Sequence, residues 1–235
     1  IASLFGFLDE DQEGWLLGVF LQAVSVVRRQ LPADTYLPDP FLFAALNNEG
    51  RLFADYSDFG KIYDLNGYAN AGLDWFAREF RDLRRMRYLP ASFKDRFYPS
   101  KRTNELGELV PTADFYEPAS LFMAFTAVIA KRQLEFKRDC QKLGMDIATM
   151  DPEALLFYAY LYYNAGRGFG RKLVRRLETA EALEKYMYSG PGHAARGNAV
   201  TVMTAYEWLY TSGAFEREPQ GRYWWSGGAG LPADE

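Results

Sequence analysis

The sequence predicts an all-α fold. Between about residues 10 and 31, apolar residues recur at the three- and four-residue spacing of an amphipathic helix. The pairs Asp39-Pro40 and Asp151-Pro152 are typical of helix starts, and they predict an aspartate N-cap followed by proline as the first helical residue. No run of polar and apolar residues alternates for long enough to predict a sheet. A chain of 235 residues is long enough for one large domain, or for a domain with a smaller appended part.

Eight helices are expected along the chain. They cover residues 10–31, 41–48, 72–88, 118–142, 154–163, 171–177, 181–188 and 199–211. Residues 50–71 are loop-like, because Gly, Asn, Asp and Ser are scattered among single aromatic residues. Residues 90–117 contain three prolines, and a loop of that length without structure is unusual, so a short helix, a hairpin or a lid is expected there. The glycine-rich end, residues 226–235, is expected to be a flexible terminus.

Composition excludes several classes of function. The chain has 27 basic and 31 acidic residues, so its overall charge does not predict a polyanion-binding protein. A single histidine rules out a site with several histidine ligands, so no metal is expected. The longest uncharged run, from Gly14 to Val27, is shorter than the ~20 residues that cross a bilayer. Because the chain begins with Ile1, we expect a processed product that has lost a signal peptide or a membrane anchor.

Two clusters of basic residues lie on predicted helices. They are Arg78, Arg81, Arg84, Arg85 and Arg87, and then Arg167, Arg171, Lys172, Arg175 and Arg176. Either cluster could face an anionic polymer, but a solvated helix face is the commoner explanation of such a charge run, so no nucleic-acid partner is expected. The glycines of residues 166–170 follow a helical pattern rather than a strand, which disfavours a phosphate-binding loop. His193 is expected in a flexible loop.

Glu49 ends an apolar helix. The preceding run, Phe41 to Leu46, would carry the glutamate toward the protein interior. Removal from water disfavours a carboxylate, raises its pKa and keeps a proton available near neutral pH. Cleavage of a glycosidic bond needs such a proton for the leaving oxygen. The alternative is a surface glutamate at a helix C-terminus, where the helix dipole mildly disfavours it.

Three segments, in this order, resemble motifs of the lytic transglycosylase and goose-type lysozyme superfamily. They are Pro40-Phe-Leu-Phe-Ala-Ala-Leu-Asn-Asn-Glu49-Gly-Arg-Leu-Phe53, then Ala71-Gly72-Leu73-Asp74-Trp75, and then Tyr162-Tyr163-Asn164-Ala165-Gly166-Arg167-Gly168. The third is the most specific, the second is weak alone, and their shared order strengthens all three. The chain departs from the family at Gly50, where the family has Ser, and at Asp74-Trp75, where it has Met-Gln.

The resemblance implies a lysozyme-like core at residues 37–178. A flanking helix would precede it at residues 1–36, and helices with a flexible tail would follow at residues 179–235. Glu49 would be the catalytic acid, the tyrosine at position 163 would reach it, and the Asn164 amide would contact sugar. The remaining substrate-binding residues would be Gly72, Leu73, Asp74, Trp75, Ala165 and Gly166. No cofactor is implied.

The function that this resemblance implies is that of a peptidoglycan lytic transglycosylase. Such enzymes cleave the β-1,4 bond between N-acetylmuramic acid and N-acetylglucosamine with one glutamate, and the sugar's own 6-hydroxyl closes a 1,6-anhydro ring. The implied location is the periplasm or cell envelope of a bacterium, with membrane attachment through a missing N-terminal segment left open.

Two alternatives remain. Hydrolysis of the goose-type lysozyme kind needs an activated water, normally held by a second carboxylate. Asp74 is the best placed candidate among Asp55, Asp58, Asp64 and Asp74, although each of these is more often a loop-capping or solvated residue. The departures at Gly50 and Asp74-Trp75 would also suit a catalytically silent module that binds glycan or an envelope protein.

Overall fold

The computed structural model describes residues 10–50, 72–91, 93, 97–103, 109–115, 118–212, 216–217 and 223–224, with side-chain surroundings for residues 17–48, 78–91, 93 and 119–212. This part of the chain is predominantly helical, as the sequence predicts. Its α-helices are α1 (Glu10–Arg28), α2 (Asp39–Gly50), α3 (Gly72–Arg85), α4 (Pro118–Gln141), α5 (Pro152–Asn164), α6 (Gly166–Leu177), α7 (Ala180–Ser189) and α8 (Ala194–Thr211). A short 3₁₀ turn, η2, covers Ile147–Thr149.

Two small antiparallel strand pairs accompany the helices. Strand β1 (Phe97–Thr103) pairs with β2 (Leu109–Phe115), and β3 (Glu216–Arg217) pairs with β4 (Tyr223–Trp224). The first pair lies within residues 90–117, where a hairpin is one of the expected alternatives. Its period-two pattern is hard to recognise because Pro99 and Pro111 stand inside the strands, opposite Ala113 and Lys101. The hairpin alternative for this segment is therefore confirmed, although no run of alternating residues indicates its strands.

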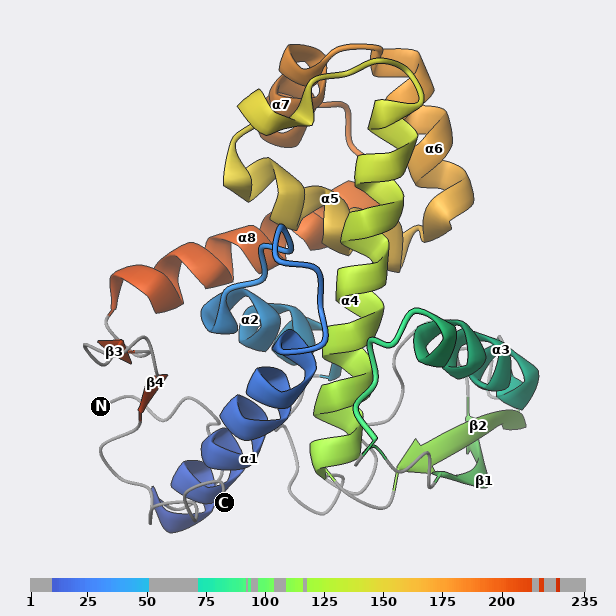
Figure 1. Cartoon of the computed structure of the whole chain (residues 1–235), viewed down its shortest axis with the longest axis vertical. Helices are drawn as coiled ribbons and strands as arrows, with labels where there is room; N and C mark the ends of the chain where they lie inside the picture. Colours follow the sequence, from blue (N-terminus) through green and yellow to red (C-terminus); the bar gives the residue numbers. More distant parts are fainter. Residues whose placement is uncertain are drawn as a thin grey trace.

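Helix α4 runs through the centre of the molecule (Figure 1). Every side chain from Ser120 to Gln133 is buried, so this helix is enclosed on all sides rather than on one face. Helices α1 and α5 pack along it, while α2 packs against α8. Helices α6 and α7 lie around its C-terminal half, and α3 with the β1–β2 hairpin lies beside its N-terminal half (Figure 1).

Aromatic side chains hold α1, α2 and α4 together. The ring of Phe20 meets the edges of Phe43 and Phe122, with centroids 5.6 and 5.5 Å away, and all three residues are buried. Such edge-to-face pairs contribute about 0.5–1.5 kcal/mol beyond the area they bury. This junction therefore fixes where the apolar part of α2 lies against the central helix.

An ion pair marks the start of α2. Asp39, which the sequence predicts as the N-cap, is instead the first helical residue, because the N–H of Leu42 already donates to the Pro38 carbonyl. The buried Asp39 carboxylate pairs with Arg28 at the end of α1, and the same guanidinium donates to the Leu37 carbonyl. The carboxylate thus ties two helices together, which local capping patterns do not reveal.

Two further helix caps lie in the second half of the chain. Asp151 caps α5 as predicted, accepting a hydrogen bond from the Glu153 N–H. His193, which the sequence predicts in a flexible loop, is the N-cap of α8, where its Nδ1 accepts from the Ala195 N–H at 3.1 Å. Its ring also stacks on Phe169 of α6, with centroids 4.4 Å apart. His193 does lie in the loop between α7 and α8, as predicted, but the glycines around it give no sign that its side chain caps a helix.

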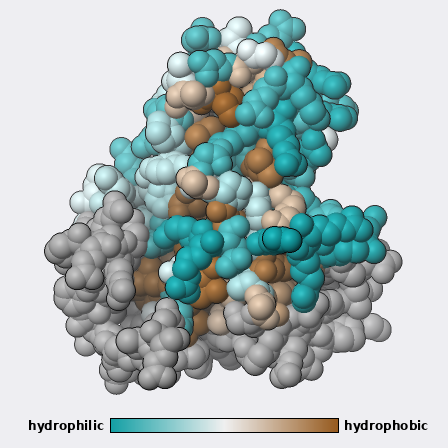
Figure 2. Space-filling model, in the orientation of Figure 1, coloured by the Kyte–Doolittle hydropathy of each residue, from teal (hydrophilic) through white to brown (hydrophobic). Residues whose placement is uncertain are grey.

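The surface of the molecule differs between its helices. Figure 2 shows hydrophilic residues over the outer side of α6 and over α3, and hydrophobic residues coming to the surface between them. None of the helices in the described residues is long and apolar enough to span a membrane.

Candidate active site

The end of α2 lies against α5. The side-chain amide of Asn48, one residue before Glu49, donates to the hydroxyl of the buried Tyr160 at 2.8 Å. The six residues of the apolar run from Phe41 to Leu46 are all buried, as expected for a helix that leads into the core. The backbone of Glu49 lies in the last turn of α2, and its side chain lies outside the described side chains.

Tyr163 belongs to the same cluster of side chains. It is buried on α5, and its ring lies 5.8 Å from that of Tyr160 and 5.6 Å from that of Phe125 on α4. Tyr160 is therefore the shared neighbour of Asn48 and Tyr163. It joins the end of α2, which carries the first motif, to the helix whose last residues begin the third motif.

The third motif forms a helix–turn–helix step. Asn164 is the last residue of α5, Ala165 is the junction, and Gly166 begins α6 with φ +76°. No atom lies within 4 Å of where a Cβ on Gly166 would stand, so the glycine is required by this left-handed conformation and not by crowding. The exposed Asn164 side chain accepts a hydrogen bond from the Asn198 amide of α8 at 3.2 Å. This bond uses the side-chain oxygen of Asn164 and leaves its amide N–H groups able to donate elsewhere.

Gly170 is required by the close packing of α6 against α5. A Cβ there would stand 2.2 Å from Cε2 of the buried Tyr162 ring, so only glycine lets α6 approach α5 so closely. The hydroxyl of Tyr162 has no hydrogen-bond partner among the described residues, and burial raises its pKa. Gly170 therefore serves helix packing, whereas Gly166 serves the left-handed turn.

The second motif forms the first turn of α3. Gly72, Leu73, Asp74 and Trp75 all lie in this turn, and their side chains are outside the described set. The other acidic candidates, Asp55, Asp58 and Asp64, lie outside the described residues altogether. The rest of α3 is held in place by contacts with α4.

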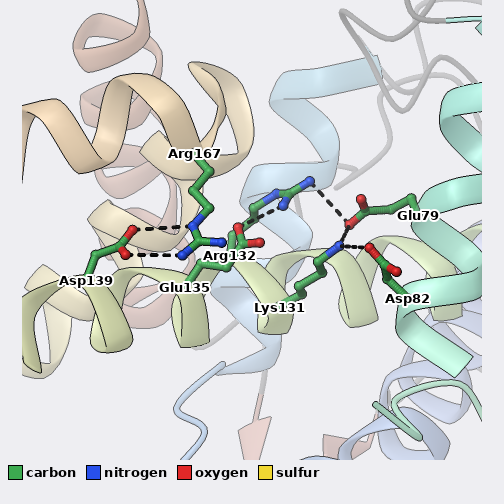
Figure 3. A network of polar contacts seen from close by, with 7 residues as sticks. All are labelled: Glu79, Asp82, Lys131, Arg132, Glu135, Asp139 and Arg167. Atoms are coloured by element: carbon green, nitrogen blue, oxygen red, sulfur yellow. Dashed lines mark hydrogen bonds and ion pairs between the residues drawn. The ribbon is translucent and has the colours of Figure 1, made fainter. Parts of the chain in front are cut away.

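A buried charge network holds α3 against α4 (Figure 3). Glu79 of α3 pairs with Lys131 at 3.0 Å and with Arg132 at 3.2 Å, and all three side chains are at most about one tenth exposed. Lys131 also reaches Asp82 at 3.3 Å, and Arg132 reaches Glu135 at 2.8 Å. Because each cation has two carboxylates, the desolvation cost of burying these charges is offset by several contacts.

The network continues toward α6. Arg167 donates from two guanidinium nitrogens to the buried Asp139 carboxylate, at 3.2 and 3.4 Å, and the two dashed lines in Figure 3 mark this pair. Hydrogen bonding to Asp139 raises the pKa of Arg167. Sequence reasoning misses this set of residues. The sequence does contain a signal for the network. Lys131 and Arg132 directly follow the apolar run of α4, and charges that continue a run buried on every side need partners.

The other reactive or charged groups singled out are a cysteine and the first basic cluster. Cys140 is buried, and burial raises the pKa of its thiol to about 12, so it stays protonated at neutral pH. The arginines of the first basic cluster, on or just after α3, are all exposed. Among the described residues, no group of histidine, cysteine or acidic side chains could hold a metal ion.

Comparisons with known proteins do not identify a family. No protein-family model matches the chain, and none of the curated proteins or solved structures is a significant match to it.

Proposed function

We propose that the chain is a peptidoglycan lytic transglycosylase with a lysozyme-like core, acting on glycan strands in the bacterial periplasm or cell envelope. Glu49 is its catalytic acid and base, and Tyr163 orients it. Asn164 and the turn that follows it bind the glycan together with the first turn of α3.

The observation that supports this proposal is the position of Tyr160. It accepts a hydrogen bond from the residue before Glu49 and packs its ring beside Tyr163. A general acid must lie within hydrogen-bond reach of the groups that orient it and of the bond it cleaves. Two distant segments that a glycan-cleaving site would need together thus meet at one side chain, and chain proximity does not account for that meeting.

The proposed reaction uses one carboxyl group twice. Protonated Glu49 gives its proton to the glycosidic oxygen, and the bond from that oxygen to C1 of N-acetylmuramic acid breaks. The 6-hydroxyl of the same sugar then bonds to C1, and its proton passes to the Glu49 carboxylate. No water is consumed, and the tethered hydroxyl has an effective concentration that a free water lacks.

Mass spectrometry of digested sacculi tests the proposal. We expect the purified protein to release fragments with 1,6-anhydro ends, each lighter by one water than a reducing-end fragment. Glu49→Gln should lower the rate by about 10²–10⁴-fold through loss of the general acid. Glu181→Gln, the same change at an exposed position in the first turn of α7, should not.

The other outcomes identify the alternatives. Predominantly reducing ends would mean a hydrolase of the goose-type lysozyme kind and would make Asp74 the next residue to replace. No cleavage by the unaltered protein, together with binding to sacculi, would mean a silent module of the cell envelope.

A further inference from the structure

Helix α6 has two halves of opposite character. At 3.6 residues per turn, its apolar residues Phe169, Leu173, Val174 and Leu177 fall on one half of the helix circumference. They pack into the core, where Leu173 and Val174 are buried. The five basic residues all fall on the other half. Helix α6 contains no acidic residue, so its outward half is uniformly positive.

Four of these cations form a surface that we call the α6 basic face. It consists of Arg171, Lys172, Arg175 and Arg176, which are all exposed and make no ion pair in the part of the chain that the structure describes. Figure 2 shows hydrophilic residues in this region at the upper right. The fifth cation, Arg167, is already paired with Asp139.

The positive charge of α6 is opposite in sign to the net charge of the rest of the chain. The five cations of α6 leave 22 basic and 31 acidic residues elsewhere, a net charge of −9. A solvated helix surface in an acidic protein would be expected to carry both signs. A one-sign face instead attracts and orients an anionic ligand.

The basic face also has a defined relation to the candidate active site. Helix α6 begins at Gly166, immediately after the Asn164-Ala165 step that is proposed to hold sugar. Arg167 and Asp139 anchor the start of this helix to α4, and Lys142 lies 4.0 Å from the same carboxylate. The helix then extends for about 18 Å from that turn. A strand that runs from Asn164 along α6 would have this positive surface beside it.

We propose that the α6 basic face binds the carboxylates of the peptide stems on the glycan strand that occupies the active site. This inference rests on the proposed function, because it takes the strand at Asn164 to be peptidoglycan. Peptide stems repeat along such a strand and end in carboxylates, whereas the sugar chain itself offers few charges. Arginine guanidinium groups pair with carboxylates through two parallel hydrogen bonds, and three of the four cations are arginines.

Binding to two kinds of glycan strand tests the proposal without relying on cleavage. Both are attached to beads, and one keeps its peptide stems, whereas an amidase has removed the stems from the other and left only one lactyl carboxylate on each N-acetylmuramic acid. All proteins carry Glu49→Gln so that the strands stay intact while the beads are sedimented. We expect tighter binding to the stem-bearing sample and an affinity that falls as salt concentration rises.

The decisive variant is Arg171→Gln with Arg175→Gln, which removes two cations one helical turn apart. It should bind stem-bearing strands about threefold to tenfold more weakly and should bind stripped strands like its parent. The matched control is Arg138→Gln with Lys185→Gln, two exposed cations on α4 and α7 that carry the same total charge. The control should bind both samples like the parent.

Three outcomes would overturn the proposal. They are equal binding of the parent to both samples, an equal loss in the control variant, and displacement by duplex DNA as effective as displacement by free stem peptide. The last would indicate a general polyanion surface. The inference and the proposed activity can also fail separately. If the protein with Glu49 intact cleaves no glycan, but binding to stems still depends on α6, this inference stands and the proposed activity is refuted.

Discussion

The amide of Asn48 donates a hydrogen bond to the hydroxyl of Tyr160 across 112 positions of sequence. Asn48 stands in the last turn of α2 beside Glu49, and the Tyr160 ring packs beside Tyr163. This contact connects the backbone that carries the proposed acid to the helix that carries the tyrosine proposed to orient it. Tyr160 is therefore proposed as a positioning residue, which touches neither the substrate nor the reacting atoms.

Replacing Tyr160 with Phe should slow turnover while leaving KM nearly unchanged. The ring and its packing remain, but the Asn48 amide loses its acceptor, and α2 is held less firmly beside α5. The cost in stability should be about 0.5–1.5 kcal/mol, the usual net value of one hydrogen bond. Chemical denaturation and steady-state kinetics on a soluble glycan substrate measure the two effects.

Tyr158→Phe provides the control for that variant. Its hydroxyl donates to the Leu183 carbonyl at 2.8 Å, so the same atom and one buried hydrogen bond are lost away from the end of α2. A similar loss of stability with unchanged turnover is expected. If both variants slow turnover equally, the effect of Tyr160 is one of general stability.

Tyr163→Phe should reduce the rate of glycan cleavage more than it reduces stability. The ring contacts with Phe125 and Tyr160 would persist, and only the hydroxyl proposed to orient Glu49 is removed. Tyr162→Phe is the same change one residue earlier, at a buried hydroxyl that is not proposed to contact Glu49. That control should keep its activity and be as stable as the parent or slightly more so, because it removes a buried polar group. A Tyr163→Phe protein that unfolds readily with normal specific activity would make Tyr163 a core residue only.

Much of the helical fold can be predicted, because its signals are local. The spacing of apolar residues and the Asp151-Pro152 start place α5 within two residues of its observed beginning. The predicted start of α6 lies five residues too late, because glycines at positions 166, 168 and 170 lower helix propensity. Gly170 is nevertheless required inside the helix, because the Tyr162 ring of the neighbouring helix leaves no room for a side chain. The role of His193 likewise depends on tertiary contacts, since its ring stacks on Phe169 of α6.

The charge network shows a second limit of sequence reasoning. Lys131 and Arg132 are identifiable as charges within an apolar helix, but their partner Glu79 is about 50 positions away. Nothing in either local pattern specifies that α3 will cross α4 at this point. The same holds for Asn48 and Tyr160. Contacts that assemble the candidate site depend on tertiary packing, while the motifs that supply its residues can be recognised beforehand.

Gly170→Ala should destabilise the fold by about 1–3 kcal/mol, because the new methyl group would overlap the Tyr162 ring. Gly168→Ala, two residues earlier in the same helix, would place its methyl group where no atom lies within 4 Å. It should stabilise the helix by up to about 1 kcal/mol through higher helix propensity. Thermal denaturation of the two variants should therefore shift in opposite directions. Equal shifts would contradict the packing argument.

Glu79→Gln should weaken the attachment of α3 to α4. The substitution removes the one carboxylate that contacts both Lys131 and Arg132, and these side chains are only 10% exposed. Loss of a partner from an isolated buried pair costs about 3–5 kcal/mol, since it leaves an uncompensated charge. Here Lys131 retains Asp82 and Arg132 retains Glu135, so the expected cost is lower, about 2 kcal/mol. For a chain of this size that corresponds to a fall in Tm of roughly 4–8 °C.

The comparison for this variant is Arg85→Gln, which breaks the 3.6 Å pair between Arg85 and Asp82 on the surface of α3. Arg85 is 71% exposed, and pairs of this kind contribute about 0–1 kcal/mol, so little change in Tm is expected. If the first turn of α3 binds the glycan, Glu79→Gln should also raise KM, because a loosened α3 presents Gly72 to Trp75 less firmly. An unchanged KM with a clearly lowered Tm would separate the second motif from substrate binding and leave the charge network with a purely structural role.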